Sequence, residues 1–143
     1  MRITRARAVP FAIVLCLLLG GWTCNQSTTQ KVATVERDFA ATVQAAQATE
    51  IAAHQAGKID DQTHKAIQGY FLQVALSGKA VDAAILAGNK AGILAALDSA
   101  AASIGTLLSQ GVGNIHDPTV KAEIQTAVLL AQSIISSAKA FVQ

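Results

Sequence analysis

DPTVKAEIQTAVLLAQSIISSAKAFV, residues 117–142, is the stretch that decides the fold. Asp117 is a favoured N-cap and Pro118 a favoured first helical residue, so the segment begins with a strong helix start. Apolar residues then recur in steps of four and three, the spacing of one face of an α-helix. This row consists of Val120, Ile124, Ala127, Ala131, Ile134, Ala138 and Phe141, widened by Val128, Ile135 and Val142. The segment therefore predicts a long amphipathic helix, the most buried in the chain.

Two segments upstream carry the same spacing. The nearer one starts after a potential cap at Asn89 and ends at the GVGN cluster of residues 111–114. Its row is Leu94, Leu97, Ala101, Ile104 and Leu108, with Ile93 beside it. The row of the other segment is Ile67, Phe71, Val74, Gly78, Val81 and Ile85. Gly88 and Asn89 either separate two helices or mark a bend in one continuous helix.

The first of the four helices has clear signals at both ends. Ser27 and Gln30 fit a capping box, and Gly57 is a natural C-terminal cap. Asp60 or Asp61 then caps the following helix. The inward row of the first helix is Val35, Phe39, Thr42, Ala46, Thr49 and Ala53, flanked by Val32 and Val43. This row is the most polar of the four.

Together these segments predict an all-α domain over residues 24–143. Its helices span about 27–56, 61–87, 90–110 and 118–142. Short connections favour antiparallel neighbours, hence an up-down-up-down four-helix bundle. Because 26 alanines but only four aromatic residues follow Cys24, we expect close helix contacts around a thin core. A thin core favours a homo-oligomer.

Residues 1–23 have the layout of an export signal. Three arginines and no acidic residue precede an apolar run over residues 8–22, which is shorter than the ~20 residues of a membrane span. The segment resembles the signals of bacterial lipoproteins, in which a Leu-small-Gly/Ala-Cys lipobox precedes the lipidated cysteine. The matching positions are Gly21, Trp22, Thr23 and Cys24. The chain departs from the pattern at Trp22, which is bulky, and at Gly21, where leucine is preferred.

The resemblance implies lipidation of Cys24. It also implies that the protein is anchored in the cell membrane or the outer membrane, with the bundle on the periplasmic, extracytoplasmic side. Two alternatives stay open: ordinary signal cleavage after Thr23, and retention of residues 1–23 as an uncleaved anchor helix.

Charge and cysteine content narrow the choice of partners. Without residues 1–23 the chain has eight basic and nine acidic side chains, so its net charge is −1. The remaining sequence has no basic patch, so a nucleic-acid partner is not expected. Cys24 is the one remaining cysteine, so no intrachain disulfide is expected. The expected partners are the membrane, a second copy and an unidentified protein.

The polar residues His54, Asp60, Asp61 and His64 gather around the first helical hairpin. Histidines with a carboxylate are a known zinc ligand set, which makes these four weak candidates for a metal site. We favour a solvated hairpin, because the aspartates serve as helix caps and His54 suits a helix C-terminus. The sequence has no Gly-x-Ser-x-Gly nucleophile motif and no glycine-rich phosphate loop. We therefore expect neither an enzyme nor a cofactor.

Two uncharged stretches raise the question of membrane insertion. Ser99–Ile115 has 17 residues and Ile124–Ala138 has 15, both short of a span, and polar residues occupy one face of each. The leading prediction is a small exported, membrane-anchored helical protein that binds or scaffolds in the bacterial cell envelope. The alternative is a membrane-perturbing protein, holin-like or pore-forming, and a third is a metal-binding protein that uses the first hairpin.

Overall fold

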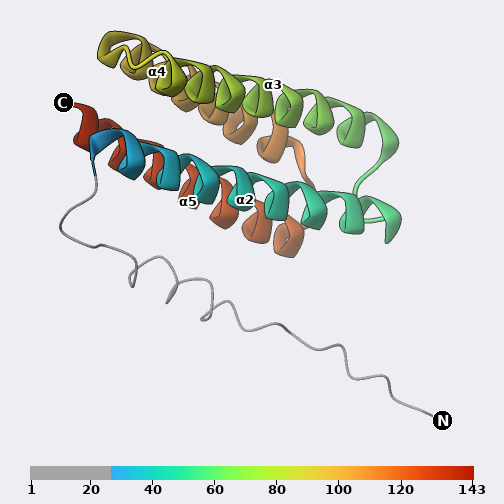
Figure 1. Cartoon of the computed structure of the whole chain (residues 1–143). Coiled ribbons are helices and arrows are strands. Elements are labelled where there is room, and N and C mark those ends of the chain that lie inside the picture. The colour runs from blue at the N-terminus through green and yellow to red at the C-terminus, as the bar shows by residue number, and fades with distance from the viewer. Residues whose placement is uncertain (1–26) are drawn as a thin grey trace.

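The computed structural model describes residues 27–143, which form helices and no strand (Figure 1). The elements are α2 (Thr28–Gln55), α3 (Asp61–Leu86), α4 (Lys90–Thr106) and α5 (Pro118–Val142). A π-helical turn (Leu107–Gly111) and a 3-10 turn (Val112–Asn114) continue α4. Cys24 and the predicted signal or anchor segment, residues 1–23, lie outside the described residues.

The helix starts expected from the sequence are present. Ser27 Oγ accepts a hydrogen bond from the Gln30 N–H at 3.3 Å, and Gln30 Oε1 accepts one from the Ser27 N–H at 3.1 Å, which confirms the capping box. Asp117 Oδ1 accepts from the N–H groups of Thr119 and Val120, both at 3.0 Å. These bonds satisfy amides that have no partner within the helix.

The turn at Gly88 and Asn89 divides α3 from α4. Gly88 has a φ of +65°, a left-handed conformation that glycine adopts without strain. Asn89 Oδ1 then accepts from the N–H groups of Ala91 and Gly92 and so caps α4. The structure therefore has two separate helices here, not one bent helix. At the preceding turn, Asp60 and not Asp61 is the N-cap of α3.

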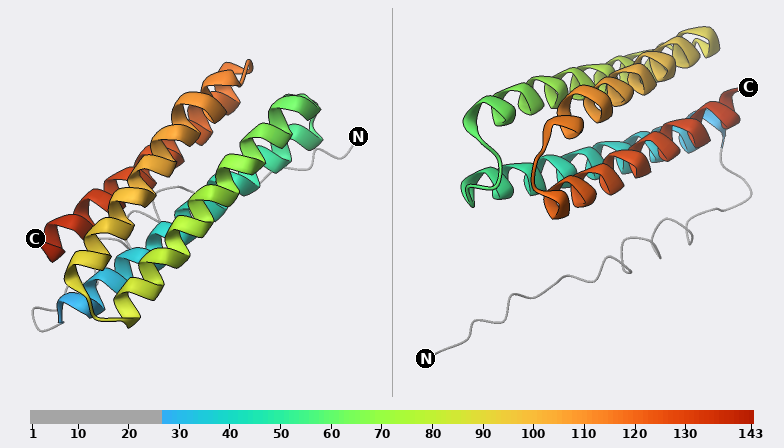
Figure 2. Two further views of the ribbon diagram at one scale, coloured as in Figure 1. Left: turned by 90° about the horizontal axis from the view of Figure 1, so that it is seen from above. Right: turned by 180° about the vertical axis from the view of Figure 1, so that it is seen from behind.

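The four helices pack closely as two layers. The most extensive contacts join α2 to α5 and α3 to α4, and smaller contacts join α2 to α3 and α4 to α5. Figure 2 shows the α2/α5 pair lying beside the α3/α4 pair. Residues 56–60 and 115–117, which connect the layers, lie together at what we term the connected end, where Lys58 Nζ is 3.9 Å from Asp117 Oδ2. The opposite, free end holds the start of α2, the Gly88–Asn89 turn and Gln143.

The predicted rows of α3 and α5 lie in the core. All six residues of the α3 row are buried, and so are the first six of the α5 row, whereas Phe141 is half-buried. Val128, Ile135 and Val142 are buried as well. As predicted, α5 contributes more buried residues than any other described helix.

The predicted row of α4 is confirmed at Leu97 and Ile104 and is wrong by one position at its other three members. Ile93, Leu97, Ala100, Ile104 and Leu107 are buried, while Leu94, Ala101 and Leu108 are only partly so. Apolar residues stand side by side at 93–94, 100–101 and 107–108, so the four-three spacing fits two registers equally well. The α-helix also ends at Thr106, before the predicted residue 110, because the chain continues into the π-helical turn.

The row of α2 holds one unexpected member. Val32, Phe39, Ala46 and Ala53 are buried, whereas Val35, Thr42, Val43 and Thr49 are half-buried. Glu50, which no prediction placed inside, has no exposed surface at all. A fully buried glutamate requires partners within the protein, and these partners define the candidate site.

One helical stretch in the described part of the chain is long and apolar enough to cross a membrane. It is Lys90–Asn114, which combines α4 with the π-helical and 3-10 turns that follow it. Only 28% of its most apolar window is buried inside the bundle. A core helix of a soluble protein meets the same criteria of length and composition.

Candidate functional site

A row of polar side chains runs along the contact between α2 and α3. We term it the polar seam. It consists of Glu36, Gln47, Glu50 and His54 on α2 with Asp61, His64, Gln68 and Asp82 on α3. Positions 47, 50 and 54 follow the four-three spacing of one helix face. Between Glu36 and Gln47 the contact is apolar, with the Phe39 ring beside Gly78, so the seam consists of two polar clusters.

Glu50 lies at the centre of the seam with both carboxylate oxygens paired. Its Oε1 is 2.9 Å from His64 Nδ1, and its Oε2 accepts a hydrogen bond from Gln68 Nε2. Gln68 Oε1 in turn accepts from Gln47 Nε2 at 2.6 Å. A buried carboxylate paired in this way avoids most of the cost of an isolated charge.

The two histidines stack on each other at the surface side of Glu50. Their ring centroids are 3.9 Å apart, and the ring planes differ by 10°. His54 Nε2 lies 2.8 Å from Asp61 Oδ1, and this hydrogen bond, with the charge of His54, holds the pKa of Asp61 below its ordinary value. Each ring is thus bound to its own carboxylate, one fully buried and one, on Asp61, 91% exposed.

The structure brings together three of the four metal candidates. His54, His64 and Asp61 are neighbours, whereas Asp60 is occupied as a helix cap. Asp60 accepts hydrogen bonds from Thr63 N–H and Thr63 Oγ1, both at 2.8 Å, which lower its pKa. The paired nitrogens of the two rings are directed to different carboxylates. Over residues 27–143 no group of three or more His, Cys, Asp or Glu side chains is arranged to hold a metal ion.

A carboxyl pair occupies the seam near the free end. Burial, followed by the charge of Asp82 and a hydrogen bond with it, raises the pKa of Glu36 from 4.5 to about 7, and Arg37 partly opposes the rise. At that pKa Glu36 holds a proton for part of the time at neutral pH, so one carboxyl can donate to the other.

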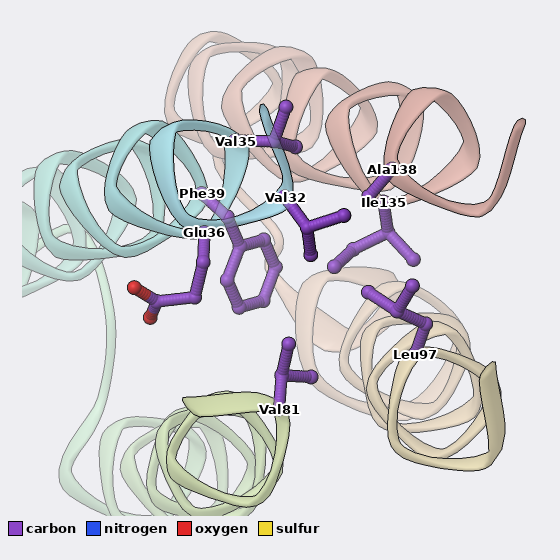
Figure 3. Close-up of a pocket in the computed structure, with 8 residues that line it drawn as sticks. All are labelled: Val32, Val35, Glu36, Phe39, Val81, Leu97, Ile135 and Ala138. Carbon is purple, nitrogen blue, oxygen red and sulfur yellow. The ribbon is translucent and has the colours of Figure 1, made fainter. Parts of the chain in front are cut away.

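A small apolar pocket borders this pair (Figure 3). Besides Glu36, its lining is Val32, Val35, Phe39, Val81, Leu97, Ile135 and Ala138, drawn from all four helices. Its volume of about 10 Å³ is close to that of one water-sized sphere. In Figure 3 the carboxylate of Glu36 points away from the apolar lining. The pocket marks incomplete packing at the free end.

Sequence reasoning missed the seam apart from its three residues at the hairpin. The missing members were Glu36, Gln47, Glu50, Gln68 and Asp82. The regular spacing of 47, 50 and 54 was the available signal, but such a row fits a solvated face equally well. The hydrogen bonds of His54 and His64 go to carboxylates and not to a hydroxyl nucleophile.

Comparisons of this chain with protein-family models, with curated proteins and with solved structures found no match.

Proposed function

We propose that the chain is a small exported helical protein that binds or scaffolds in the bacterial cell envelope without catalysis. In this proposal the helices form an up-down-up-down bundle, held at the cell membrane or the outer membrane through a lipid on Cys24. The observation that supports a binding role is the outer face of α3, which carries apolar side chains that the core does not use.

That face carries three large apolar side chains in solvent. Leu72, Leu76 and Leu86 are 61%, 55% and 88% exposed. Together with Ala83 they form what we term the outer row, whose positions 72, 76, 83 and 86 fit a seven-residue pattern around Lys79. Because the inner row of α3 is already buried, a second apolar row on the same helix is typical of a contact surface.

The outer row suits a second copy of this chain. If two α3 helices pair antiparallel about Lys79, Leu72 faces Leu86 of the other copy, and Leu76 lies level with Asp82, next to Ala83. The two Lys79 side chains then meet at the centre, with an Asp82 carboxylate of each copy one helical turn away. The row is therefore self-complementary in shape.

Analytical ultracentrifugation of the full chain in mild detergent tests this contact. We expect a dimer at micromolar concentration, and a monomer for the double variant Leu72→Gln/Leu76→Gln. Leu129→Gln is the matched control, since Leu129 is also exposed but lies on α5. A monomeric wild type, or equal loss of dimer in the control, would contradict a role for the outer row.

The anchor is tested separately by growing cells with a radiolabelled fatty acid. The wild type should incorporate label, and Cys24→Ala should not. A wild type without label removes the lipoprotein assignment and leaves ordinary export or an uncleaved anchor.

A membrane-perturbing role is the second candidate, and the length and composition of Lys90–Asn114 favour it. Dye release from liposomes distinguishes this role. Release by the full chain supports it, whereas an inert protein that melts cooperatively supports the stable bundle.

A further inference from the structure

The two ends of the bundle carry opposite net charge. In each helix the eight residues nearest the free end cover about 12 Å of its length. These are residues 28–35, 79–86, 90–97 and 135–142. They hold one acidic side chain, Asp82, and four lysines, a net charge of +3: Lys31, Lys79, Lys90 and Lys139. The matching residues at the connected end, 48–68 and 107–125, hold three lysines and five acidic side chains, a net charge of −2 with the histidines neutral.

The lysines closest to the free end are not neutralised by carboxylate side chains. Lys31 Nζ lies 6.0 Å from the centroid of the Phe141 ring, and Lys90 Nζ donates to Gln143 O at 3.1 Å. Within residues 27–143 neither lysine is in an ion pair with Asp or Glu, whereas Lys139 pairs with Asp98. The positive charge of Lys31 and Lys90 is therefore available to an outside partner.

A large apolar side chain is presented at the same end. Leu86, the last residue of α3, is 88% exposed, and the exposed Ala87 follows it into the turn that leads to α4. The segments at the connected end behave in the opposite way, because their apolar residues Ile59 and Ile115 are buried in the core. A leucine held in solvent beside unpaired lysines combines the two features of a protein surface that enters the membrane interface.

The chain also enters the bundle at the free end. Ser27, the N-cap of α2, lies there (Figure 1), and Cys24 precedes it by three residues. Three residues span at most about 11 Å. A chain held in a membrane up to Cys24, as in the proposed function, therefore has the free end as its nearest part.

We infer that the free end of the bundle docks on an anionic membrane surface, with Lys31 and Lys90 facing the lipid phosphates and Leu86 entering the interface. Lysines are attracted to anionic lipids over about one Debye length, and an exposed leucine is stabilised by leaving water. The acidic connected end is repelled and points away from the membrane. The inference rests on the membrane anchor of the proposed function and adds to it the lipid class and the orientation of the bundle.

Docking also limits the pairing of outer rows. Antiparallel pairing about Lys79 directs the free ends of the two copies in opposite directions. Two docked copies therefore cannot pair in this way on one membrane surface, although each still exposes Leu72 and Leu76. An anionic membrane thus favours single copies, whereas detergent permits the pair.

Lysine labelling of the full chain in vesicles tests the docking surface. A membrane-impermeant acylating reagent is applied to the chain in phosphatidylcholine vesicles and in vesicles that also contain phosphatidylglycerol, and mass spectrometry measures the modification of each lysine. We expect the reactivity of Lys31 and Lys90 to fall about threefold in the anionic vesicles. The connected-end lysines, Lys58, Lys65 and Lys121, serve as the internal reference and should not change. High salt should remove the protection.

Two variants test the part played by the exposed leucine. Leu86→Gln should reduce the protection of Lys31 and Lys90, and it leaves the core intact because the side chain lies in solvent. Leu129→Gln, at an exposed leucine of α5, is the matched control and should keep the protection of the wild type. Equal protection in both variants would remove Leu86 from the docking surface.

The remaining outcomes separate the docking surface from the anchor. A chain that floats with both kinds of vesicle, but whose lysines react equally in them, overturns the docking surface and leaves the anchor in place. Protection of Lys31 and Lys90 already in detergent would assign the free end to a protein contact and also overturn it. A chain that floats with neither kind of vesicle overturns the anchor, and the docking surface with it.

Discussion

Helix α2 makes two contacts of opposite chemistry. Toward α5 it packs extensively, with Val32 beside Ile135 and Ala138. Toward α3 it makes a smaller contact that includes the polar seam and the buried Glu50. Small apolar side chains let helices approach closely and carry no charge, so the first contact is insensitive to pH. The contact through the polar seam is smaller, but its hydrogen bonds are directional and its carboxyl groups respond to pH.

We expect the largest loss of stability from a substitution in the apolar core. Phe71→Ala removes a ring that is 1% exposed, and we expect a loss of about 3–5 kcal/mol in the free energy of unfolding. Urea unfolding followed by circular dichroism measures it. The loss should be equal at pH 5.5 and pH 8.0. A marked difference between the two values would show that the core and the polar seam are energetically coupled.

Disrupting the buried part of the polar seam should lower the free energy of unfolding nearly as much as Phe71→Ala does. His64→Ala leaves Glu50 Oε1 without its partner, for a loss of about 3 kcal/mol. The double variant Glu50→Gln/His64→Ala should recover part of this, since no buried charge then remains. If both variants lose the same amount, the cost lies in lost packing and not in the unpaired carboxylate.

Enlarging an alanine probes the close contacts of α2. Ala46 is fully buried, so Ala46→Leu should cost about 1–3 kcal/mol by forcing neighbouring side chains apart. Thermal unfolding with Ala48→Leu as control, at an exposed position of the same helix, separates crowding from helix propensity. A stabilised Ala46→Leu would indicate unfilled space at this contact.

We expect the smallest change in stability at the exposed end of the polar seam, where His54 pairs with Asp61. The pKa of Asp61 is lowered from 3.8 by His54, so its contribution is present above that value and is lost as the pH falls below it. Asp61→Asn should therefore flatten slightly the fall of the melting temperature between pH 5 and pH 2.5. An unchanged curve would show that this pair does not contribute.

Parts of the fold could be predicted because their signals lie within a short stretch of the chain. Asp117 and Pro118 act through their own backbone, so the start of α5 could be placed without knowledge of the packing, whereas Gly88 and Asn89 fitted either a break or a bend. The registers predicted for α3 and α5 are the buried ones, apart from the half-buried Phe141. In α4, pairs such as Leu107 and Leu108 offer two registers, and only the neighbouring helices select between them.

Most of the polar seam could not be predicted from the sequence, for a different reason. Whether Glu50 meets solvent or His64 depends on how α2 and α3 are rotated against each other, which no local pattern encodes. His54, His64 and Asp61 were identified as neighbours because the hairpin joins them within a short stretch of chain. The partnership of Glu36 with Asp82, which lie far apart in the sequence, could not be anticipated.

The central claim is that protons on the polar seam help to hold the two layers together. Its most direct test is the free energy of unfolding of the wild type and Glu36→Gln, measured by urea titration from pH 5 to pH 8. We predict that the wild type loses about 1 kcal/mol relative to the variant as the pH rises, after allowance for screening of this partly exposed carboxyl. Parallel pH profiles for the two proteins would contradict the account.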